Sequence, residues 1–257
     1  MGVSARQREY FSPAGIHVFA HRGYAAGKFT ENTWAAFDAA LAAGATHIES
    51  DVHATSDGIA VLAHDSDLSR VAGDSRTIAQ LTWAEVSKID LGSGGIPTLA
   101  DTLAKYTKAR FNLDIKDASA IESTVKAIEQ AAAESRVLVS SFSGSTRRKA
   151  LSLFSHGSVV TSADSSLVLR LWLACLMRRL ARFKALAEGC QALQIPTHFG
   201  PIRLDSPRFI RFAHEAGMVV DYWTINDVAE IRRLVARGAD GIVTDDTALA
   251  VATLANL

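Results

Sequence analysis

Histidines, carboxylates and basic side chains follow several apolar, strand-like runs in this sequence. In chain order they are His21-Arg22-Gly23, Glu49 with Asp51, His64, and Asp114-Ile115-Lys116. Carboxylates can hold a hard divalent cation, basic side chains can hold a phosphate group, and two imidazoles can move protons. This combination of residues predicts metal-assisted attack on a phosphate ester.

Two pairs of charged residues have the spacing that puts side chains on one face of a strand. Glu49 and Asp51 are two residues apart in an otherwise apolar run, so both point the same way. Two such carboxylates repel each other unless a cation lies between them. Asp114 and Lys116 repeat the spacing on another run. The structural alternatives are two exposed acids on a rim and a simple salt bridge within one strand.

His21 and His64 each follow an apolar run, and both are expected at the ends of neighbouring strands next to the carboxylate cluster. A single histidine is more often structural than catalytic, but two histidines next to a carboxylate cluster favour a functional role. The ordinary pKa of imidazole, near 6.5, lets it serve as acid or base around neutral pH. His53 continues the face of Glu49 and Asp51, and it either lines the site or packs beneath it.

Strand-like and helix-like runs alternate along most of the chain and must position these residues. Predicted strands cover 16–20, 46–52, 111–115, 136–142, 158–161, 191–195, 218–223 and 241–244. Predicted helices cover 33–43, 119–134, 145–154, 165–186, 206–215, 228–237 and 246–254. Parallel strands joined by helices can close into an eight-stranded TIM barrel. The alternative is an open doubly wound sheet, which usually has a glycine-rich phosphate turn after its first strand.

The segment at about 55–99 interrupts this alternation. Asp57-Gly58 predicts a turn, so 59–63 is expected to pair back on the second strand. A polar, glycine-containing stretch follows, with one short helix-like piece near 82–88. We therefore predict a single TIM-barrel domain over residues 1–257, with an insertion after its second strand that packs over one side of the barrel mouth.

Composition excludes several other classes of protein. The chain has 257 residues and a formal net charge of zero, so nothing points to a nucleic-acid partner. Hydrophobic residues make up 48% and charged residues 21%, as is usual for soluble globular proteins. Two cysteines without zinc-like spacing and a polar N-terminal stretch without a signal-peptide pattern favour a cytoplasmic location.

The segment 167–184 is strongly apolar at first and then basic. It is too short to span a bilayer, and Arg170 interrupts it, so no transmembrane segment is predicted. The favoured account is a helix that packs against the strands through Leu167, Leu171, Ala174 and Leu176, with the arginines in water. In the alternative, three side chains project beside the site and contact an acyl chain or a membrane surface: Val168, Leu169 and Trp172.

Nine short motifs stand in the order in which the glycerophosphodiester phosphodiesterase family has them. They are His21-Arg22-Gly23, Glu31-Asn32-Thr33, Glu49-Ser50-Asp51-Val52, Thr55-Ser56-Asp57-Gly58, Val61-Leu62-Ala63-His64-Asp65, Pro97-Thr98-Leu99, Asp114-Ile115-Lys116, Trp223-Thr224-Ile225-Asn226 and Gly241-Ile242-Val243-Thr244-Asp245. The chain resembles this family from about residue 16 to residue 249. The resemblance implies a TIM barrel like that of phosphatidylinositol-specific phospholipase C. It also implies hydrolysis of small glycerophosphodiesters to glycerol 3-phosphate and an alcohol, with Ca²⁺ or Mg²⁺.

The same resemblance implies a role for each matching residue. The implied metal ligands are Glu49, Asp51 and Asp114. The implied acid/base pair is His21 and His64, and the implied phosphate-binding residues are Arg22 and Lys116. Glu31 is expected beside the metal and His21 as a supporting group, and Trp223 is expected to wall the glycerol or leaving-group pocket. Asp114 is shorter than the glutamate that often takes the third ligand position in the family.

We therefore expect an enzyme, a metal-dependent phosphoric diester hydrolase. Two other functions remain open: a lysophospholipase D that acts on lipid-tailed glycerophosphodiesters, and a catalytically idle barrel used for binding. A serine hydrolase has little support because there is no GxSxG motif. The sequence does not decide which histidine is the acid and which is the base.

Overall fold

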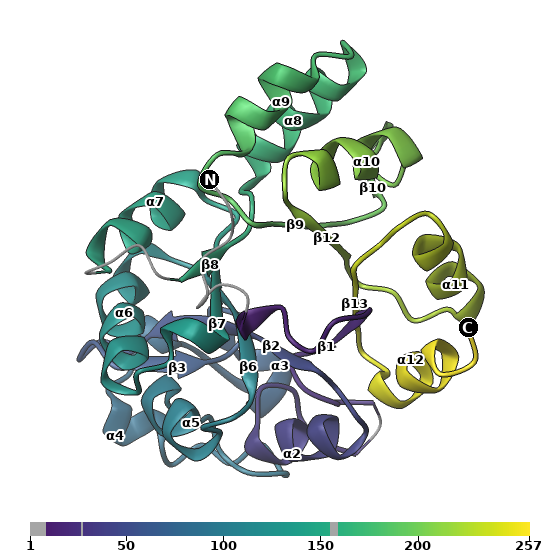
Figure 1. Ribbon diagram of the computed structural model, residues 1–257. Coiled ribbons are helices and arrows are strands. Elements are labelled where there is room, and N and C mark those ends of the chain that lie inside the picture. The colour runs from purple at the N-terminus through teal and green to yellow at the C-terminus, as the bar shows by residue number, and fades with distance from the viewer. Residues whose placement is uncertain (1–8, 27, 155–158) are drawn as a thin grey trace.

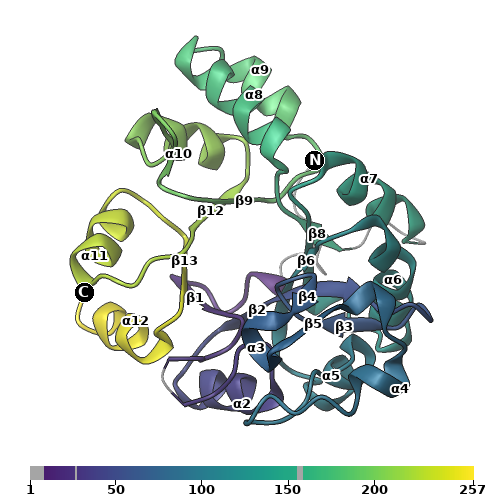
Figure 2. The ribbon, with the colours of Figure 1, turned by 180° about the vertical axis from the view of Figure 1, so that it is seen from behind.

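The computed structural model describes residues 9–26, 28–154 and 159–257. Within these residues, eight parallel strands form a barrel surrounded by helices (Figure 1, and from behind in Figure 2). The strands are β1 (His17–His21), β2 (His47–Ala54), β6 (Arg110–Ile115), β7 (Val137–Ser140), β8 (Val160–Thr161), β9 (Ala192–Ile195), β12 (Val219–Tyr222) and β13 (Gly241–Thr244). The predicted TIM barrel is confirmed.

The strands are hydrogen-bonded in the order β8-β7-β6-β2-β1-β13-β12-β9. A parallel bridge between Ser162 and Ala192 joins β8 to β9 and brings the two ends of the sheet together. The observed strands begin and end within a few residues of the predicted ones. Part of the predicted strand 158–161 lies outside the described residues, because Ser158 is not among them.

Successive side chains of each barrel strand point to opposite faces, as the pleat requires. In β6, Phe111, Leu113 and Ile115 pack in the core between strands and helices. Asn112 and Asp114, which have the other parity, line the cavity inside the barrel. Deeper in the interior, one side chain from each of five strands joins a small apolar cluster with Tyr10: Phe19, Leu138, Val160, Ala192 and Val243. The barrel is thus filled at depth, and Asn112 and Asp114 bring polar side chains to the cavity at its mouth.

Helices cover the outside of the barrel. They are α2 (Trp34–Ala42), α5 (Leu99–Lys105), α6 (Ile121–Gln130), α7 (Gly144–Leu153), α8 (Ser165–Leu176), α9 (Leu180–Ala187), α10 (Pro207–Glu215), α11 (Val228–Ala236) and α12 (Thr247–Leu254), with the 3-10 turns η2 (Ala118–Ala120) and η3 (Glu134–Arg136). Several begin at side chains that cap free backbone amides; Asp227, for example, accepts from the amide of Glu230. None of the helices formed by the described residues has both the length and the apolar character that crossing a membrane requires.

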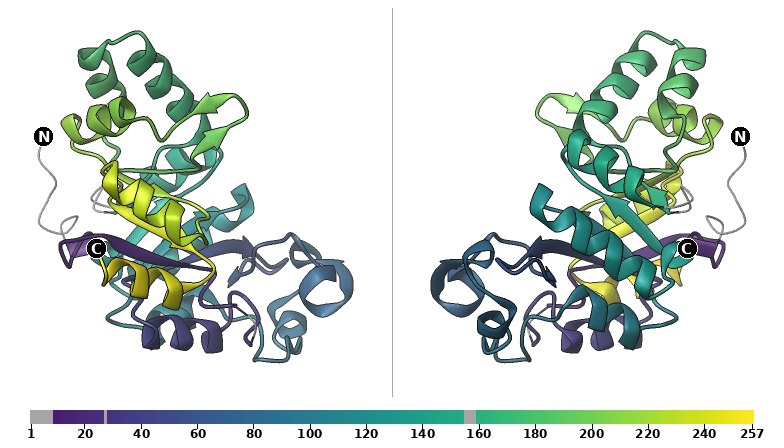
Figure 3. Two further views of the ribbon diagram at one scale, coloured as in Figure 1. Left: turned by 90° about the vertical axis from the view of Figure 1, so that its right-hand side faces the viewer. Right: turned by 90° about the vertical axis from the view of Figure 1, so that its left-hand side faces the viewer.

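An insertion follows β2 and protrudes from the barrel on the same side as a short hairpin of β10 (His198–Phe199) and β11 (Ile202–Arg203) (Figure 3). It contains β3 (Ala60–Leu62), β4 (Asp67–Leu68), α3 (Ser69–Ala72), β5 (Asp74–Thr77), η1 (Ile78–Gln80) and α4 (Trp83–Val86). β3 pairs antiparallel with β2, as the Asp57-Gly58 turn predicts. The insertion has a small apolar core of its own, which includes Leu68, Ile78 and Val86.

The predicted helix 165–186 is wrong as a single helix, because the chain turns back after α8 and packs α9 against it (Figure 1). Arg178 has a left-handed φ of 56°, and the amide of Arg179 donates to the carbonyl of Ala174. This is the backbone pattern that ends many helices, usually with glycine at the left-handed position. A second feature was not predicted: β10 (His198–Phe199) and β11 (Ile202–Arg203) form a short hairpin after β9.

Candidate active site

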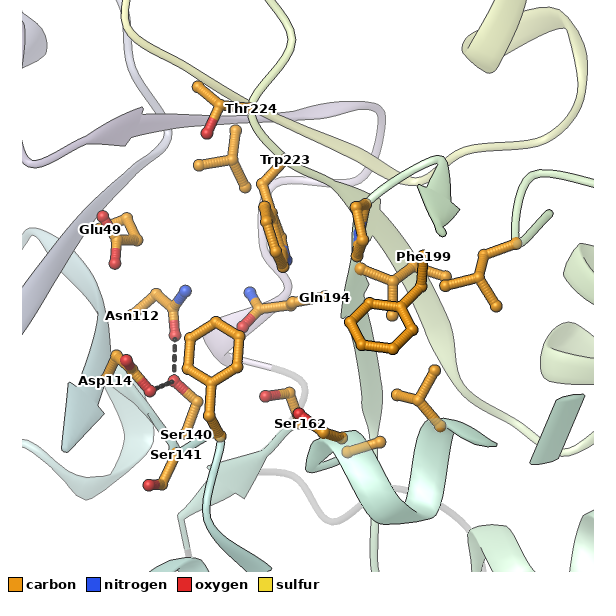
Figure 4. A pocket seen from close by; sticks show the side chains of 18 of the residues that line it. Glu49, Asn112, Asp114, Ser140, Ser141, Ser162, Gln194, Phe199, Trp223 and Thr224 are labelled. Carbon is orange, nitrogen blue, oxygen red and sulfur yellow. Dashed lines mark hydrogen bonds between the residues drawn. The ribbon is translucent and has the colours of Figure 1, made fainter. Parts of the chain in front are cut away.

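A cavity of about 580 Å³ lies at the C-terminal ends of the barrel strands. All of the predicted site residues except Glu31 line it. Figure 4 shows the carboxylates Glu49 and Asp114 on one side and Phe199 on the other, with Trp223 and Gln194 between them. Side chains that are far apart in the sequence therefore meet here because parallel strands end at the same rim.

The turn after β1 positions the first cluster of site residues. Arg22 and Gly23 have φ angles of 57° and 84°. A Cβ on Gly23 would lie only 2.8 Å from the Cβ of Ala36, so both conformation and space require glycine. This turn directs the backbone amide of Arg22 to Glu49, whose Oε2 accepts at 3.1 Å. The guanidinium of Arg22 then lies against the carboxylates of the site.

His21, the last residue of β1, is held by a carboxylate from the opposite end of the chain. Its Nδ1 lies 2.6 Å from Oδ1 of Asp245, which directly follows β13. The other oxygen of Asp245 accepts from Nδ2 of Asn226 at 2.6 Å. The hydrogen bond with His21 helps to hold the pKa of Asp245 below its usual value. Because Nδ1 is committed to Asp245, Nε2 is the ring nitrogen available to a substrate.

His64 is oriented in the same way by its neighbour. Its Nδ1 lies 2.7 Å from Oδ1 of Asp65, and the other oxygen of Asp65 accepts from Nε of Arg70 at 2.7 Å. Arg70 also donates to both carboxylate oxygens of Glu31, at 2.9 and 2.6 Å. Glu31 accepts in addition from Arg22, at 3.2 Å. Glu31 thus supports the site from behind, and it links the insertion to the turn after β1.

The three predicted ligand carboxylates lie on neighbouring strands and are almost fully buried. Asp51 and Asp114 are paired in the register of β2 and β6. The ammonium group of Lys116 lies 2.6 Å from Oδ1 of Asp51 and 3.0 Å from Oδ2 of Asp114. Arg22 adds a longer contact, 3.4 Å from its Nε to Oδ2 of Asp51. Two basic side chains therefore share this cluster with Glu49, Asp51 and Asp114.

Burial and mutual repulsion make the cluster unfavourable in its fully ionised form. Burial raises the pKa of Glu49 well above its usual range, and the charges of Asp51 and Asp114 raise it further. Burial also raises the pKa of Asp114, although Lys116 opposes this. Burial alone would lower the pKa of Lys116, but the two aspartates outweigh it and raise that pKa. The site therefore favours additional positive charge.

The chemistry of this donor set fits a hard divalent cation, which prefers oxygen ligands. Oδ2 of Asp51 and Oδ2 of Asp114 are buried and have no hydrogen-bond partner of good geometry, despite their ion-pair distances to Arg22 and Lys116. Within the described residues, no three acidic, histidine or cysteine side chains already converge in an arrangement that would hold a metal ion. Arg22 and Lys116 contact these carboxylates directly.

The other half of the cavity is apolar. Trp223 packs edge-on against Phe142, with ring centroids 6.0 Å apart. Further along, the lining residues come from α8 and from the β10–β11 hairpin: Val168, Leu169, Trp172, Phe199 and Ile202. The cavity thus offers charged groups for a phosphate at one end and an apolar wall at the other.

The structure confirms some of the predictions for the residues of α8 and contradicts one. The expected packing of Leu167, Leu171 and Ala174 is confirmed, because all three are buried. The expectation for Leu176 is wrong, because its side chain is 58% exposed. Val168, Leu169 and Trp172 do lie beside the site, as in the alternative account.

Several residues that complete the site were missed from the sequence. Asp245 and Asn226 stand in two of the nine motifs, but no role was assigned to them. Arg70 lies in the irregular insertion, where nothing in the pattern marks it. His53 does not line the cavity; its Nδ1 lies 2.8 Å from Oδ2 of Asp117, and its Nε2 lies 3.2 Å from the carbonyl of His64. Its role is to support the chain around His64.

Several known proteins are similar in sequence to this chain over most of its length. A family model described as "Glycerophosphoryl diester phosphodiesterase family" matches residues 21–249. "Probable glycerophosphodiester phosphodiesterase 2" from Mycobacterium tuberculosis is 37% identical over 238 residues, which cover 92% of this chain and 90% of the relative. "Lysophospholipase D GDPD1" from Rattus norvegicus is 25% identical over an alignment of 262 positions, which covers 88% of this chain and 82% of the relative.

Solved structures share the fold. A putative glycerophosphoryl diester phosphodiesterase from Silicibacter pomeroyi superposes with a TM-score of 0.79 at 24% identity, covering 98% of this chain and 97% of that one. An Oleispira antarctica phosphodiesterase, solved in complex with the product sn-glycerol-3-phosphate, has a TM-score of 0.75 at 24% identity. It covers 94% of this chain and 97% of that one.

Proposed function

Because the chain belongs to the glycerophosphoryl diester phosphodiesterase family and is a phosphoric diester hydrolase, we propose a metal-dependent mechanism with histidine catalysis. The reaction cleaves a glycerophosphodiester to glycerol 3-phosphate and an alcohol. One observation carries the proposal: His21 and His64, each oriented by an aspartate, open into the same cavity as a buried cluster of carboxylates and basic groups.

The basic groups of the site bind the phosphodiester. Arg22 presents a planar guanidinium that can donate to two phosphate oxygens, and Lys116 presents a compact ammonium. Both are already held against carboxylates, so they are ordered before substrate arrives. Groups fixed in this way stabilise the negative charge that grows on the phosphate oxygens in the transition state.

The two histidines move the protons. One Nε2 accepts a proton from the nucleophile, which is water or the substrate's own glycerol hydroxyl; in the second case a cyclic glycerol phosphate forms first, and water then opens it to glycerol 3-phosphate. The other donates a proton to the departing alkoxide, so that the alcohol leaves as a neutral molecule. Asp245 and Asp65 keep the opposite ring nitrogen of each histidine hydrogen-bonded, and they stabilise the imidazolium when it forms.

Glu49, Asp51 and Asp114 would hold the divalent cation, Ca²⁺ or Mg²⁺. When bound, such a cation neutralises charge on the phosphodiester and polarises its oxygens. The carboxylates themselves are fixed by the register of β2 and β6 and by the amide of Arg22, which orients Glu49.

A second candidate is hydrolysis of lipid-tailed glycerophosphodiesters, the lysophospholipase D reaction. The apolar half of the cavity favours it, because Trp172, Leu169 and Phe199 offer hydrocarbon surface in the same cavity as the catalytic groups. The relative from Rattus norvegicus carries the name of this activity. The same phosphate-binding and acid/base groups would serve both reactions.

The products distinguish these possibilities. We would incubate the enzyme with glycerophosphocholine or with lysophosphatidylcholine and follow the phosphorus-containing products by ³¹P NMR. The proposal predicts glycerol 3-phosphate from the first substrate, and the second candidate predicts lysophosphatidic acid from the second. Release of choline phosphate from either substrate, or no turnover of either with Ca²⁺ or Mg²⁺ present, would contradict the proposed function.

A further inference from the structure

One face of α8 exposes a row of large apolar side chains. Leu169, Leu173 and Leu176 are spaced four and three residues apart, which places them on one side of the helix. Their exposed fractions are 46%, 42% and 58%. Trp172 lies in the same row and is partly exposed. Trp172 packs partly against the core, but packing does not account for the three exposed leucines, because the opposite face of α8 already supplies the contacts with the barrel.

This row, which we call the α8 stripe (Leu169, Trp172, Leu173 and Leu176), is continuous with the catalytic cavity. Leu169 and Trp172 line the cavity wall, whereas the other two leucines carry the apolar surface outward. Phe199, at the tip of the β10–β11 hairpin, also lines the cavity and is 69% exposed. An apolar track therefore runs from the reacting groups to the outer surface. In Figure 1, α8 and α9 project away from the barrel.

The surroundings of the α8 stripe are strongly basic. From Ser165 to Ala187 the chain contains no acidic residue. Five basic residues lie in this stretch, all of them exposed: Arg170, Arg178, Arg179, Arg182 and Lys184. None of the five forms an ion pair with any residue of the described part of the chain. Since the whole chain has a formal net charge of zero, this local excess is a specific feature of the α8–α9 hairpin.

We propose that the α8 stripe docks the mouth of the cavity on an anionic lipid surface. An apolar helical face bordered by basic side chains is the pattern that binds such surfaces, through burial of the apolar face and attraction to lipid phosphates. The stripe enters the interface, and the basic residues contact the headgroups. A single-chain lipid phosphodiester then passes from the membrane along the apolar track to His21 and His64. This last step rests on the function proposed above; the docking itself does not.

The test separates docking from catalysis. We would measure co-sedimentation of the full chain with vesicles of phosphatidylcholine alone or with added phosphatidylserine, at low and high salt. The test variant is the double change Leu173→Ser and Leu176→Ser, because neither side chain lines the cavity. The matched control is Leu153→Ser on α7, whose side chain is 42% exposed, as is that of Leu173. A second variant, Arg179→Gln with Arg182→Gln, removes charge and leaves the apolar stripe intact.

The proposal predicts binding to vesicles with phosphatidylserine that weakens with salt. Binding should fall about tenfold or more in both double variants and stay unchanged in the control. Hydrolysis of water-soluble glycerophosphocholine should be the same in all of them, while turnover of lysophospholipid presented in the same vesicles should fall with binding. Absence of glycerophosphocholine hydrolysis would reject the proposed function alone, since vesicle binding is measured without substrate.

Three results would overturn the docking proposal. The first is equal binding to vesicles with and without phosphatidylserine at low salt. The second is unchanged binding in the leucine double variant. The third is a dimer of the unmodified chain that the leucine changes convert to a monomer, because the α8 stripe would then be an interface between two copies.

Discussion

The imidazole of His21 and the carboxylate of Asp245 lie 2.6 Å apart, although 224 residues separate them in the chain. β1 and β13 are neighbours in the barrel, so His21 at the end of β1 and Asp245 directly after β13 meet at the rim. Asn226 donates its amide to the other oxygen of Asp245 and so fixes which oxygen faces the histidine. This arrangement sets the orientation of the ring and keeps Nε2 directed to the cavity.

Asp245→Asn should therefore impair catalysis without unfolding the enzyme. Asn226 would hold the new carbonyl oxygen, and the new NH₂ group would face Nδ1 of His21. The ring proton would move to Nε2, and the imidazolium would lose its carboxylate partner. We expect kcat to fall by about 10²-fold or more with little change in KM. The matched control is Asp246→Asn, because Asp246 caps α12 and asparagine caps helices equally well. Equal activity in the two variants would refute the positioning role.

His21→Ala and His64→Ala should each lower kcat by about 10²–10⁴-fold. Thermal unfolding would check that both variants remain folded. The variant that lacks the general acid should recover much of its activity on a glycerol phosphodiester with a nitrophenolate leaving group, because that group leaves without a proton. This comparison also assigns the roles. Similar losses on good and poor leaving groups for both variants would exclude either histidine as the acid.

Arg22→Lys keeps the charge but removes the planar guanidinium that contacts Glu31 and Asp51. Lysine donates from a single nitrogen, so it cannot bridge two phosphate oxygens in the same way. We expect kcat/KM for glycerophosphocholine to fall about tenfold or more. Arg76→Lys is a suitable control, since Arg76 lies in the insertion and, among the residues that the structure describes, forms an ion pair only with Asp74. An Arg22→Lys enzyme with unchanged kinetics would place this side chain away from the phosphate.

The sequence was sufficient to predict the parts of the site that depend on strand periodicity. A strand alternates its side chains, so the two-residue spacing of Glu49 and Asp51 fixes a common face whatever the surroundings. Parallel strands that end at one rim then bring His21 and Asp114 to the same cavity. Gly23 stands in the first of the nine motifs, but the reason for glycine there, a left-handed turn packed against Ala36, appears only in the structure.

Pairings that form only in three dimensions could not be read from local patterns. Asp65, Arg70 and Glu31 form one chain of hydrogen bonds, yet Arg70 comes from an irregular insertion whose path no periodicity predicts. The sequence did not predict the break between α8 and α9, because the residue with the left-handed φ at the break is Arg178 and not glycine. The β10–β11 hairpin has strands of only two residues, which is too short for alternation to show.

A buried acid beneath the site should make stability depend on pH. Asp221 is fully buried on β12, and burial, with a contribution from Asp240, raises its pKa to about 8. The unfolded chain has the ordinary value near 3.9. Between these values the folded protein holds a proton that the unfolded chain has released, so stability falls as pH rises through this window. The slope is at most about 1.4 kcal/mol per pH unit for this group.

Asp221→Asn should remove the contribution of this residue to the pH dependence of stability. Its melting temperature should change less than that of the unmodified enzyme between pH 5 and pH 8, and the variant should be the more stable of the two at about pH 8. Thermal unfolding at several pH values would test this. Asp240→Asn is not a suitable control, because Asp240 contributes to the shift; Asp227→Asn, at the start of α11, is suitable. Parallel pH profiles for Asp221→Asn and the unmodified enzyme would show that Asp221 is ionised when buried.

The most direct test of the account is the dependence of glycerophosphocholine hydrolysis on a divalent cation held by Glu49, Asp51 and Asp114. Activity would be measured after removal of metal with EDTA and after return of Ca²⁺ or Mg²⁺, in the unmodified enzyme and in Asp51→Asn. We predict loss of turnover with EDTA, recovery with the cation, and a much higher cation requirement in the variant. Full turnover in excess EDTA, with the same rate before and after addition of either cation, would contradict the account.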